Sequence, residues 1–234
     1  MTSPGGTSGT YNFAPSVGEL TLWAWNRCGI RPTALTQEHM QDAMMTANLL
    51  ALEWSAKAGV NLWTVELTTV PFVQGVATYA VPSNIIGVLD LYVTITNGVQ
   101  PIDRYILPIS RTEYASYSQK AQQGFPTTYW FDKLLSQNIT FWPVPDGTQA
   151  SFSYYGFTQI QDMNVANGQQ AAMNAYALPA FAAGLAAKLA VAWAPDKVMM
   201  LKAEAVESYA IFADQNVETA NTYITPTLSS YWRT

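Results

Sequence analysis

Residues 36–65 read TQEHMQDAMMTANLLALEWSAKAGVNLWTV. Apolar residues recur through this stretch at steps of three and four, which is the pattern of a helix with one buried face. Thr36 is a suitable N-cap, and Ala58-Gly59 is a typical helix end. Leu62-Trp63-Thr64-Val65 then predicts a strand. The segment therefore predicts a helical layer that passes directly into a sheet. The predicted buried face consists of Met40, Ala43, Met44, Ala47, Leu50, Ala51 and Trp54.

An earlier helix is predicted from Ser16 to Cys28. Ser16 and Glu19 have the spacing of a capping box, and Gly29 is placed to end the helix. The residues predicted to share its buried face are Leu20, Trp23, Ala24 and Cys28.

The middle of the chain predicts β structure, because apolar and polar residues alternate with period two. Asn97-Gly98 is a strong hairpin signal, and a second hairpin is expected from Tyr129 to Trp142, followed by a strand at Phe152–Phe157. A short helix is expected at Ser110–Gln119, opened by Ser110 and Glu113. The positions predicted to face inward are Trp63, Val65, Leu67, Tyr79, Val81, Leu89, Leu91, Val93 and Ile95.

Two further helices are predicted near the C-terminus. Pro179 suits the first turn of one, and Pro195-Asp196 starts the other. The predicted buried face of the last helix is Val198, Leu201, Ala205, Tyr209, Phe212 and Asn216. The fold class expected is therefore α+β: a helical layer from both ends of the chain with an antiparallel β-rich insert. The expected parts are an extended N-terminal arm at 1–15, the helical layer at 16–60 and 178–220, the insert at 61–160, and a tail at 221–234.

Composition limits the possible functions. Of the 234 residues, 49% are hydrophobic and only 12% charged, roughly half the usual charged share. A surface so poor in charge, with 8 Trp and 13 Tyr, favours extensive contact with partner proteins. The net charge of −5 and scattered basic residues argue against tight nucleic-acid binding by one copy. The apolar tract Leu178–Ala194 is short for a membrane span and contains Lys188, so a buried helix is expected. No signal peptide is evident.

No catalytic residue, cofactor site or metal site is predicted. Cys28 and His39, the only residues of their types, could form a nucleophile dyad, but they fall on different predicted helices. The carboxylate pairs Glu204/Glu207 and Asp214/Glu218 each lie on one helix, which is typical of a solvated face and not of a glycosidase. A cluster of aromatic residues in the insert could stack sugars or bases, although a hairpin core is the commoner role. That cluster is Tyr129, Trp130, Phe131, Phe141, Trp142, Tyr154 and Tyr155.

The order of these elements resembles the head-to-tail adaptor proteins of tailed phages, also called tail accessory factors or tubular tail protein A. The resemblance covers roughly residues 16–215 and rests on the order and spacing of several weak motifs. These are Cys28-Gly29-Ile30 at a helix end, the helix with Asn48–Trp54, Gly59 and Leu62-Trp63, the hairpin Gly75–Pro82, Pro126–Trp130, Ile139–Gly147, Tyr154-Tyr155-Gly156 and the Pro179 helix.

The resemblance implies a structural virion protein and not an enzyme. Family members form a closed ring, here expected to hold twelve identical copies, between the portal protein and a tail tube or nozzle protein. Genomic DNA passes through the lumen without sequence-specific binding, and no membrane is involved. The protein would lie at the head–tail interface of the virion after assembly in the host cytoplasm. The alternative is another β-rich tail component that binds carbohydrate or a receptor.

The tail after Thr222 is the candidate partner-binding segment, since family members often dock to the portal through the C-terminal region. It is almost uncharged and rich in aromatic and aliphatic residues. The residues expected to dock to the portal are Tyr223, Ile224, Leu228, Tyr231, Trp232 and Arg233.

Overall fold

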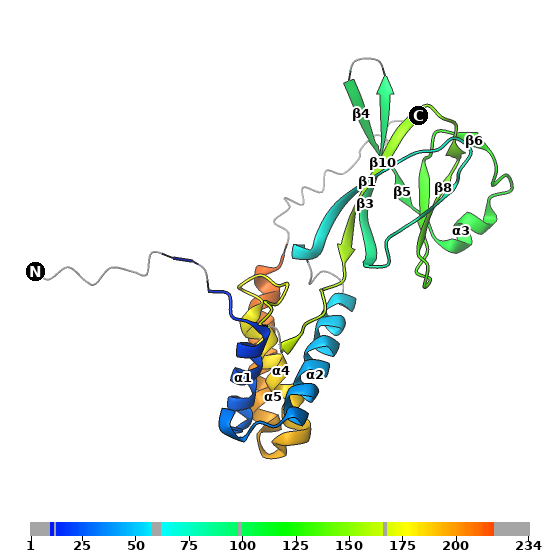
Figure 1. Ribbon diagram of the computed structural model, residues 1–234. Coiled ribbons are helices and arrows are strands. Elements are labelled where there is room, and N and C mark those ends of the chain that lie inside the picture. Colours follow the sequence, from blue (N-terminus) through cyan, green and yellow to red (C-terminus); the bar gives the residue numbers. More distant parts are fainter. Residues whose placement is uncertain (1–9, 12, 58–61, 98–99, 166–167, 218–234) are drawn as a thin grey trace, which may run out of the picture.

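The computed structural model describes residues 10–11, 13–57, 62–97, 100–165 and 168–217. Figure 1 shows two bodies, a helical body below and a β body above. The helical body comes from both ends of the chain and the β body from its middle. The α+β fold class predicted from the sequence is therefore confirmed.

Most helix boundaries lie within a few residues of the predicted ones, and the helix end predicted at Ala58-Gly59 lies outside the described residues. Short 3-10 turns lie at η1 (Pro32–Ala34), η2 (Leu62–Thr64) and η4 (Pro195–Lys197). The α-helices are α1 (Val17–Cys28), α2 (Gln37–Ala56), α3 (Arg111–Ser116), α4 (Leu178–Trp193) and α5 (Val198–Gln215).

Local sequence signals set most of these boundaries. The Ser16–Glu19 capping box of α1 is present in both directions: the backbone N–H of Glu19 donates to Ser16 Oγ at 3.2 Å, and that of Ser16 donates to Glu19 Oε2 at 2.8 Å. Gly29 ends α1 with a φ of 89°, a left-handed conformation that favours glycine. Thr36 begins α2, with His39 in the reciprocal capping role.

α4 is the central helix of the helical body, and it contacts α1, α2 and α5. Its small residues allow the close approach of these neighbours. Gly184 shows this most clearly, because a Cβ atom at this position would lie 3.2 Å from Leu50 Cδ2 of α2. The predicted faces of α2 and α5 are confirmed, with Leu50, Trp54, Leu201 and Phe212 all buried.

One residue of the α1 face was predicted wrongly. Trp23 is 41% exposed, and Trp25 is fully buried in its place. The ring of Trp25 makes edge contacts with His39 and Trp193, with centroids 5.1 Å and 5.9 Å apart. Trp25 therefore joins α1 to α2 and α4, a contact that the periodicity of α1 alone could not indicate.

Two four-stranded sheets pack face to face in the β body. The first has the order β1-β10-β3-β4 and is antiparallel; the second has the order β2-β8-β7-β5, with β5 and β7 parallel. β6 and β9 form a separate parallel pair. The strands are β1 (Val65–Pro71), β2 (Thr78–Ala80), β3 (Ile85–Asn97), β4 (Gln100–Tyr105), β5 (Leu107–Pro108), β6 (Gln123–Gly124), β7 (Thr128–Phe131), β8 (Asn138–Trp142), β9 (Val144–Pro145) and β10 (Gln149–Thr158).

Three predictions for the β body were wrong. Leu62-Trp63-Thr64 forms the turn η2, so β1 starts at Val65. Leu67 faces outward, because its neighbours Thr68 and Val70 pair with the buried Tyr154 and Phe152. Leu89 also faces outward. Tyr155 pairs with Asp90 and Gly156 pairs with Val88, so Leu89 lies in a β-bulge without a cross-strand partner. The bulge interrupts the alternation of inward and outward side chains along β3.

The remaining differences concern two helix ends. The helix expected at Ser110–Gln119 ends at Ser116, where Lys120 Nζ donates to the carbonyl oxygens of Ala115 and Tyr117. Pro195-Asp196 forms the turn η4, and α5 begins at Val198. The predicted hairpin at Asn97-Gly98 is supported by the pairing of Asn97 with Gln100, although residues 98–99 lie outside the described residues.

Polar contacts hold the segment that follows β10 against α2. Ser55 Oγ of α2 accepts from the backbone N–H of Ile160 at 3.0 Å. The side chain of Asn48 bonds to both the N–H and the carbonyl of Met163, at 2.8 Å and 3.0 Å. Figure 1 shows this segment running from β10 down to the helical body. The segment after β10 is therefore anchored to α2 before α4 begins.

Candidate partner-binding surfaces

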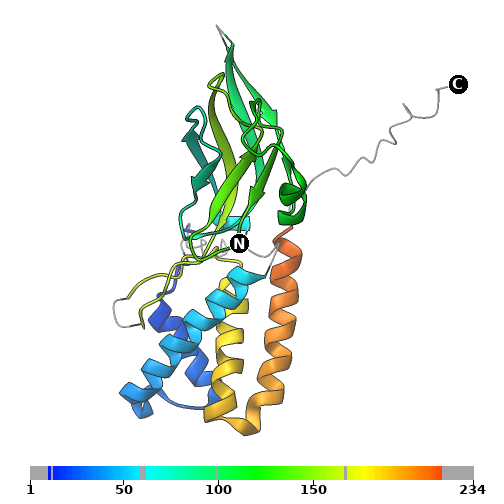
Figure 2. The same ribbon diagram turned by 90° about the vertical axis from the view of Figure 1, so that its right-hand side faces the viewer.

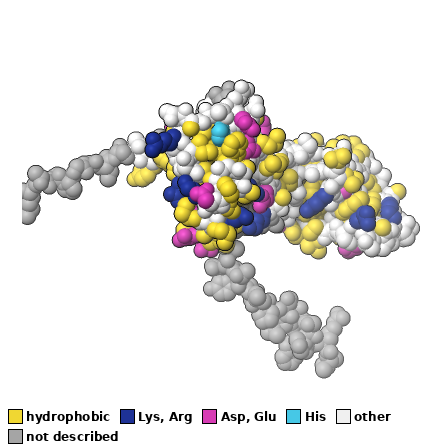
Figure 3. Space-filling model, turned by 90° about the horizontal axis from the view of Figure 1, so that it is seen from below, with side chains coloured by type: hydrophobic (Ala, Val, Ile, Leu, Met, Phe, Trp, Pro, Cys, Tyr) yellow, Lys and Arg dark blue, Asp and Glu magenta, His cyan; other side chains and the backbone are white. Residues whose placement is uncertain are grey.

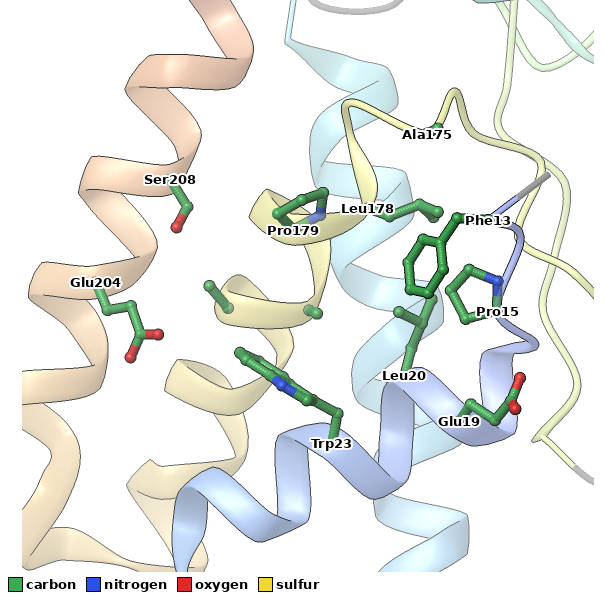
Figure 4. A pocket seen from close by; sticks show the side chains of 12 residues that line it. Phe13, Pro15, Glu19, Leu20, Trp23, Ala175, Leu178, Pro179, Glu204 and Ser208 are labelled. Carbon is green, nitrogen blue, oxygen red and sulfur yellow. The ribbon is translucent and has the colours of Figure 1, made fainter. Parts of the chain in front are cut away.

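A groove of about 520 Å³ runs between α1 and α5, with α4 as its floor. Figure 4 shows the side chains that line it, from the N-terminal segment and from these three helices. Most are apolar, and Ala182 and Ala183 of α4 leave room because their side chains are small. The lining residues are Phe13, Pro15, Glu19, Leu20, Trp23, Ala175, Leu178, Pro179, Ala182, Ala183, Glu204 and Ser208.

The groove lies between α1 and α5, which both pack on α4. Arg27 of α1 forms an ion pair with Glu204 of α5. The guanidinium of Arg27 also lies 5.6 Å from the centroid of Trp23. The exposed indole of Trp23 is thereby held along the wall of the groove.

The polar groups of the groove suit binding better than proton transfer. Glu204 is already paired with Arg27. The pKa of Glu19 is lowered first by the backbone N–H of Ser16 and second by the Ser16 hydroxyl, because both hydrogen bonds stabilise the charged carboxylate. Glu204 is therefore held in an ion pair, and Glu19 is stabilised as a carboxylate.

The candidate dyad of Cys28 and His39 is not assembled. Cys28 is buried and its Sγ lies 3.6 Å from the carbonyl oxygen of Ala186. Burial raises the pKa of this thiol, which disfavours the thiolate. His39 Nδ1 instead lies 2.6 Å from Thr36 Oγ1, and its ring packs on Trp193 with centroids 4.1 Å apart. Both residues therefore have structural roles.

The candidate carboxylate pair Glu204/Glu207 does not face across a cleft. Glu204 and Glu207 both belong to α5, and Glu204 is ion-paired with Arg27. Asp214 is exposed, and Glu218 lies outside the described residues. Among the residues that the structure describes, no three His, Cys, Asp or Glu side chains gather closely enough to hold a metal ion.

The aromatic cluster of the insert serves mainly to pack the β body. Tyr129, Phe141 and Tyr154 are buried between the two sheets. Trp142 stacks on Tyr117 with centroids 4.0 Å apart, and its Nε1 donates to the carbonyl oxygen of Gln119.

The other members of that cluster lie nearer the surface. Trp130 stacks on Tyr114 with centroids 5.5 Å apart, so both indoles, Trp130 and Trp142, hold the α3 region against the second sheet. Phe131 is half-buried, and Tyr155 is the member whose side chain is exposed.

The predicted portal-docking residues Tyr223, Ile224, Leu228, Tyr231, Trp232 and Arg233 lie outside the described residues. The groove was not predicted from the sequence. Its residues come from segments far apart in the chain, and the periodicity of α1 placed Trp23, which lines the groove, on the buried face of that helix.

Charges of both signs are spread over the helical body. Figure 3 views the molecule from below and shows acidic, basic and apolar side chains interspersed on that face, with no continuous basic patch there. In the described part of the chain, no helix has the length and hydropathy needed to cross a membrane.

Comparison with known protein families identifies the class of protein. A family model described as SU10 adaptor protein matches residues 24–225, which include both the helical body and the β body. The chain therefore belongs to the SU10 adaptor protein family and is an adaptor-type structural protein of a phage particle. No curated protein matches it. The adaptor class implied by the sequence resemblance is thus confirmed, and the head-to-tail ring remains a prediction.

Proposed function

We propose that the protein is a head-to-tail adaptor that forms a closed ring of identical copies. The ring would bind the portal protein on one side and a tail tube or nozzle protein on the other. The observation that carries this proposal is the family match, because it spans both bodies of the molecule and not a single module. A count of twelve copies is the number that the resemblance to head-to-tail adaptors implies.

The surface chemistry supports an assembly role. The groove between α1 and α5 is apolar and contains no catalytic arrangement. The net charge of −5 disfavours tight binding to phosphates. A ring with a weakly acidic lumen would allow DNA to pass without adhering to the wall. The protein would lie at the head–tail interface of the virion, after assembly in the host cytoplasm.

The portal contact is assigned in this proposal to the C-terminal tail at 221–234. Its docking residues would be Tyr223, Ile224, Leu228, Tyr231, Trp232 and Arg233. Aromatic residues and arginine are the types that dominate binding energy at protein interfaces. A short, nearly uncharged segment with this composition suits insertion between subunits of a larger ring.

The test is to mix the purified protein with purified portal and to image the product by electron microscopy. The full chain should add a symmetric collar beneath the portal. A chain truncated after Thr222 should fold but add no collar. A full chain that never binds portal would refute the adaptor role, whereas unchanged binding by the truncated chain would refute only the tail assignment.

A carbohydrate- or receptor-binding role receives less support, because Trp130 and Trp142 are stacked against Tyr114 and Tyr117. Glycan binding that is lost in Trp130→Ala or Trp142→Ala would favour that alternative. The variants must keep the wild-type melting curve for this result to count.

A further inference from the structure

The outward face of α5 is an apolar ridge. Its residues follow one another at steps of four and three, the spacing at which a helix offers a continuous seam to a second helix. Met199 is 82% exposed and Val206 is 71% exposed, and each is larger than its alanine neighbours on the ridge. We call this the α5 ridge; it consists of Met199, Ala203, Val206, Ala210 and Ala213.

The inward face of α5 packs against the core of the helical body. Leu201 and Phe212 are buried against the helical core, about half a turn away from the ridge. A surface helix normally carries its apolar residues on one face only. A second apolar face on α5 therefore indicates that another protein surface covers it.

The outward face of α2 carries a second ridge with the same spacing. Met45 is 61% exposed, Leu49 is 56% exposed and Leu52 is 44% exposed. Ala56 continues the seam at the end of the helix. We call Met45, Leu49, Leu52 and Ala56 the α2 ridge.

The two ridges lie on different flanks of the helical body. Figure 2 shows α2 in front of α4 and α5 to its right, and both helices pack on α4 through their inward faces. Because the ridges point away from α4, they cannot cover each other within one chain. Each needs a partner from another molecule.

The ridges are complementary in size. The α2 ridge offers the long side chains of Met45, Leu49 and Leu52. On the α5 ridge the small Ala203 lies between Met199 and Val206, and the other two members are alanines. Long side chains on one helix fit between small ones on the other when helices pack closely. The α2 ridge is about 17 Å long and the α5 ridge about 21 Å, at 1.5 Å per residue.

The directions of the helices also agree. Figures 1 and 2 show α2 and α5 both running from the lower end of the helical body toward the β body. Rotation about an axis along the helices preserves their direction, so α2 of one copy and α5 of the next would lie parallel. A contact between two different surfaces of this kind can close into a ring.

Contacts between identical ridges are less favourable. Two α5 ridges would bring together the exposed acids Glu207 and Asp214 that lie beside each ridge. Two α2 ridges could pair, but the contact would close on itself and leave the α5 ridge uncovered. A contact between unlike ridges covers both and repeats from copy to copy.

We propose that the α2 ridge of one copy packs against the α5 ridge of the next copy, and that this contact joins neighbours in the ring. The inference rests on the proposed function, since it specifies the self-contact of that ring. The occupant of each ridge is thus a second copy of this chain and not a host protein or a lipid surface.

Cysteine cross-linking of the full chain tests the contact. Three variants are needed: Leu49→Cys, Val206→Cys and the double variant. Each is treated with a short bis-maleimide, with and without portal, and then separated on a denaturing gel. The double variant should give a ladder of dimers, trimers and larger products. An equal mixture of the single variants should give dimers only, and each single variant alone should remain monomeric on the gel.

Two controls separate this contact from unspecific reaction. The wild-type chain has only Cys28, which is buried, and it should give no product. A chain with Leu49→Cys and Asn26→Cys has a second cysteine on the exposed surface of α1, and it should give no ladder. Both substituted ridge side chains are exposed, so melting curves should match the wild type.

The outcomes distinguish the inference from the proposed function. Dimers from Leu49→Cys alone would show that like ridges pair, which would overturn the inference. A collar seen beneath the portal, with no ladder from the double variant, would also overturn it while leaving the adaptor role intact. Failure of the wild-type chain to form a collar counts against the adaptor role, whereas the ladder reports the ridge contact itself.

Discussion

The indole Nε1 of Trp193, at the end of α4, donates a hydrogen bond to Asp42 Oδ2, near the start of α2, at 2.6 Å. The two residues are 151 positions apart in the chain. The ring of His39 packs on the same indole with centroids 4.1 Å apart. This contact therefore joins α2 to α4 at the lower end of the helical body.

Replacement of Asp42 should destabilise the helical body. Asp42→Ala removes the acceptor and should lower the free energy of unfolding by about 1 kcal/mol, because a half-buried indole N–H loses its charged partner. Asp42→Asn keeps an acceptor oxygen and should cost less. Urea unfolding followed by tryptophan fluorescence measures both. Glu207→Ala, at an exposed site on α5, is the control, and an equal effect of all three substitutions would contradict the assignment.

Gly184 should not tolerate a larger side chain. A Cβ atom on this residue would lie 3.2 Å from Leu50 Cδ2, so the two further methyl groups of valine would force α2 and α4 apart. Gly184→Val should lower the free energy of unfolding by about 1–3 kcal/mol, the range for overpacking a core. Chemical denaturation provides the measurement. Ala192→Val places the same side chain on the exposed face of α4, and it should cost clearly less.

The features predicted best from the sequence were those that depend on a few neighbouring residues. The capping residues Ser16 and Thr36 and the helix-ending Gly29 act within one turn of the chain, and all three have the predicted roles. The inward faces of β1 and β3 were less predictable. Alternation defines two faces for each strand, but the partner residues Phe152 and Tyr154 decide which one is buried.

The candidate sites were less predictable than the fold, for a related reason. The groove depends on the approach of α1, α4 and α5, which no single segment encodes. The α5 ridge, however, is indicated by the spacing of apolar residues in the sequence. Met199, Ala203, Val206 and Ala210 repeat at helical spacing opposite the predicted buried face, so a second apolar face could have been noticed from the sequence alone.

Tyr129 should make the β body sensitive to alkaline pH. Burial, and then the neighbouring Tyr105 and Asp90, raise the pKa of its hydroxyl from 10.0 to about 12. A group with a raised pKa in the folded state contributes stability that is complete below pH 10 and is lost as the pH rises toward 12. Tyr129→Phe has no hydroxyl to ionise. It should therefore lose less stability than the wild type over this interval, by up to about 2 kcal/mol.

Unfolding free energies from urea titrations at several alkaline pH values provide the measurement for Tyr129. Tyr155→Phe is the matched control, because this tyrosine lies on the outer face of the same β body and is 40% exposed. Its alkaline profile should follow the wild type. If Tyr129→Phe also followed the wild type, the buried hydroxyl would not be the source of the alkaline loss.

The capping box of α1 should contribute both to the stability of the helix and to the loss of stability at acidic pH. Ser16→Ala removes the acceptor for the Glu19 backbone N–H and should lower the free energy of unfolding by about 1 kcal/mol. Asn26→Ala, at an exposed position of the same helix, should have a smaller effect. Thermal unfolding followed by circular dichroism compares the two variants, and equal losses would argue against a capping role for Ser16.

The acid response follows from the lowered pKa of Glu19. A carboxyl whose pKa is lowered by folding contributes stability above its ordinary value, here 4.5, and this contribution is lost as the pH falls through the lower folded value. Glu19→Gln cannot bind or release a proton, so its stability should change less than that of the wild type between about pH 6 and about pH 3. Ser16→Ala should be intermediate, because the backbone N–H of residue 16, the larger cause of the shift, still donates to Glu19.

NMR titration of the Glu19 side chain distinguishes the effect of the Ser16 backbone N–H from that of the Ser16 hydroxyl. The pKa of Glu19 should rise only part of the way toward 4.5 in Ser16→Ala. A complete return to that value would mean that the hydroxyl, and not the backbone N–H, controls this carboxylate.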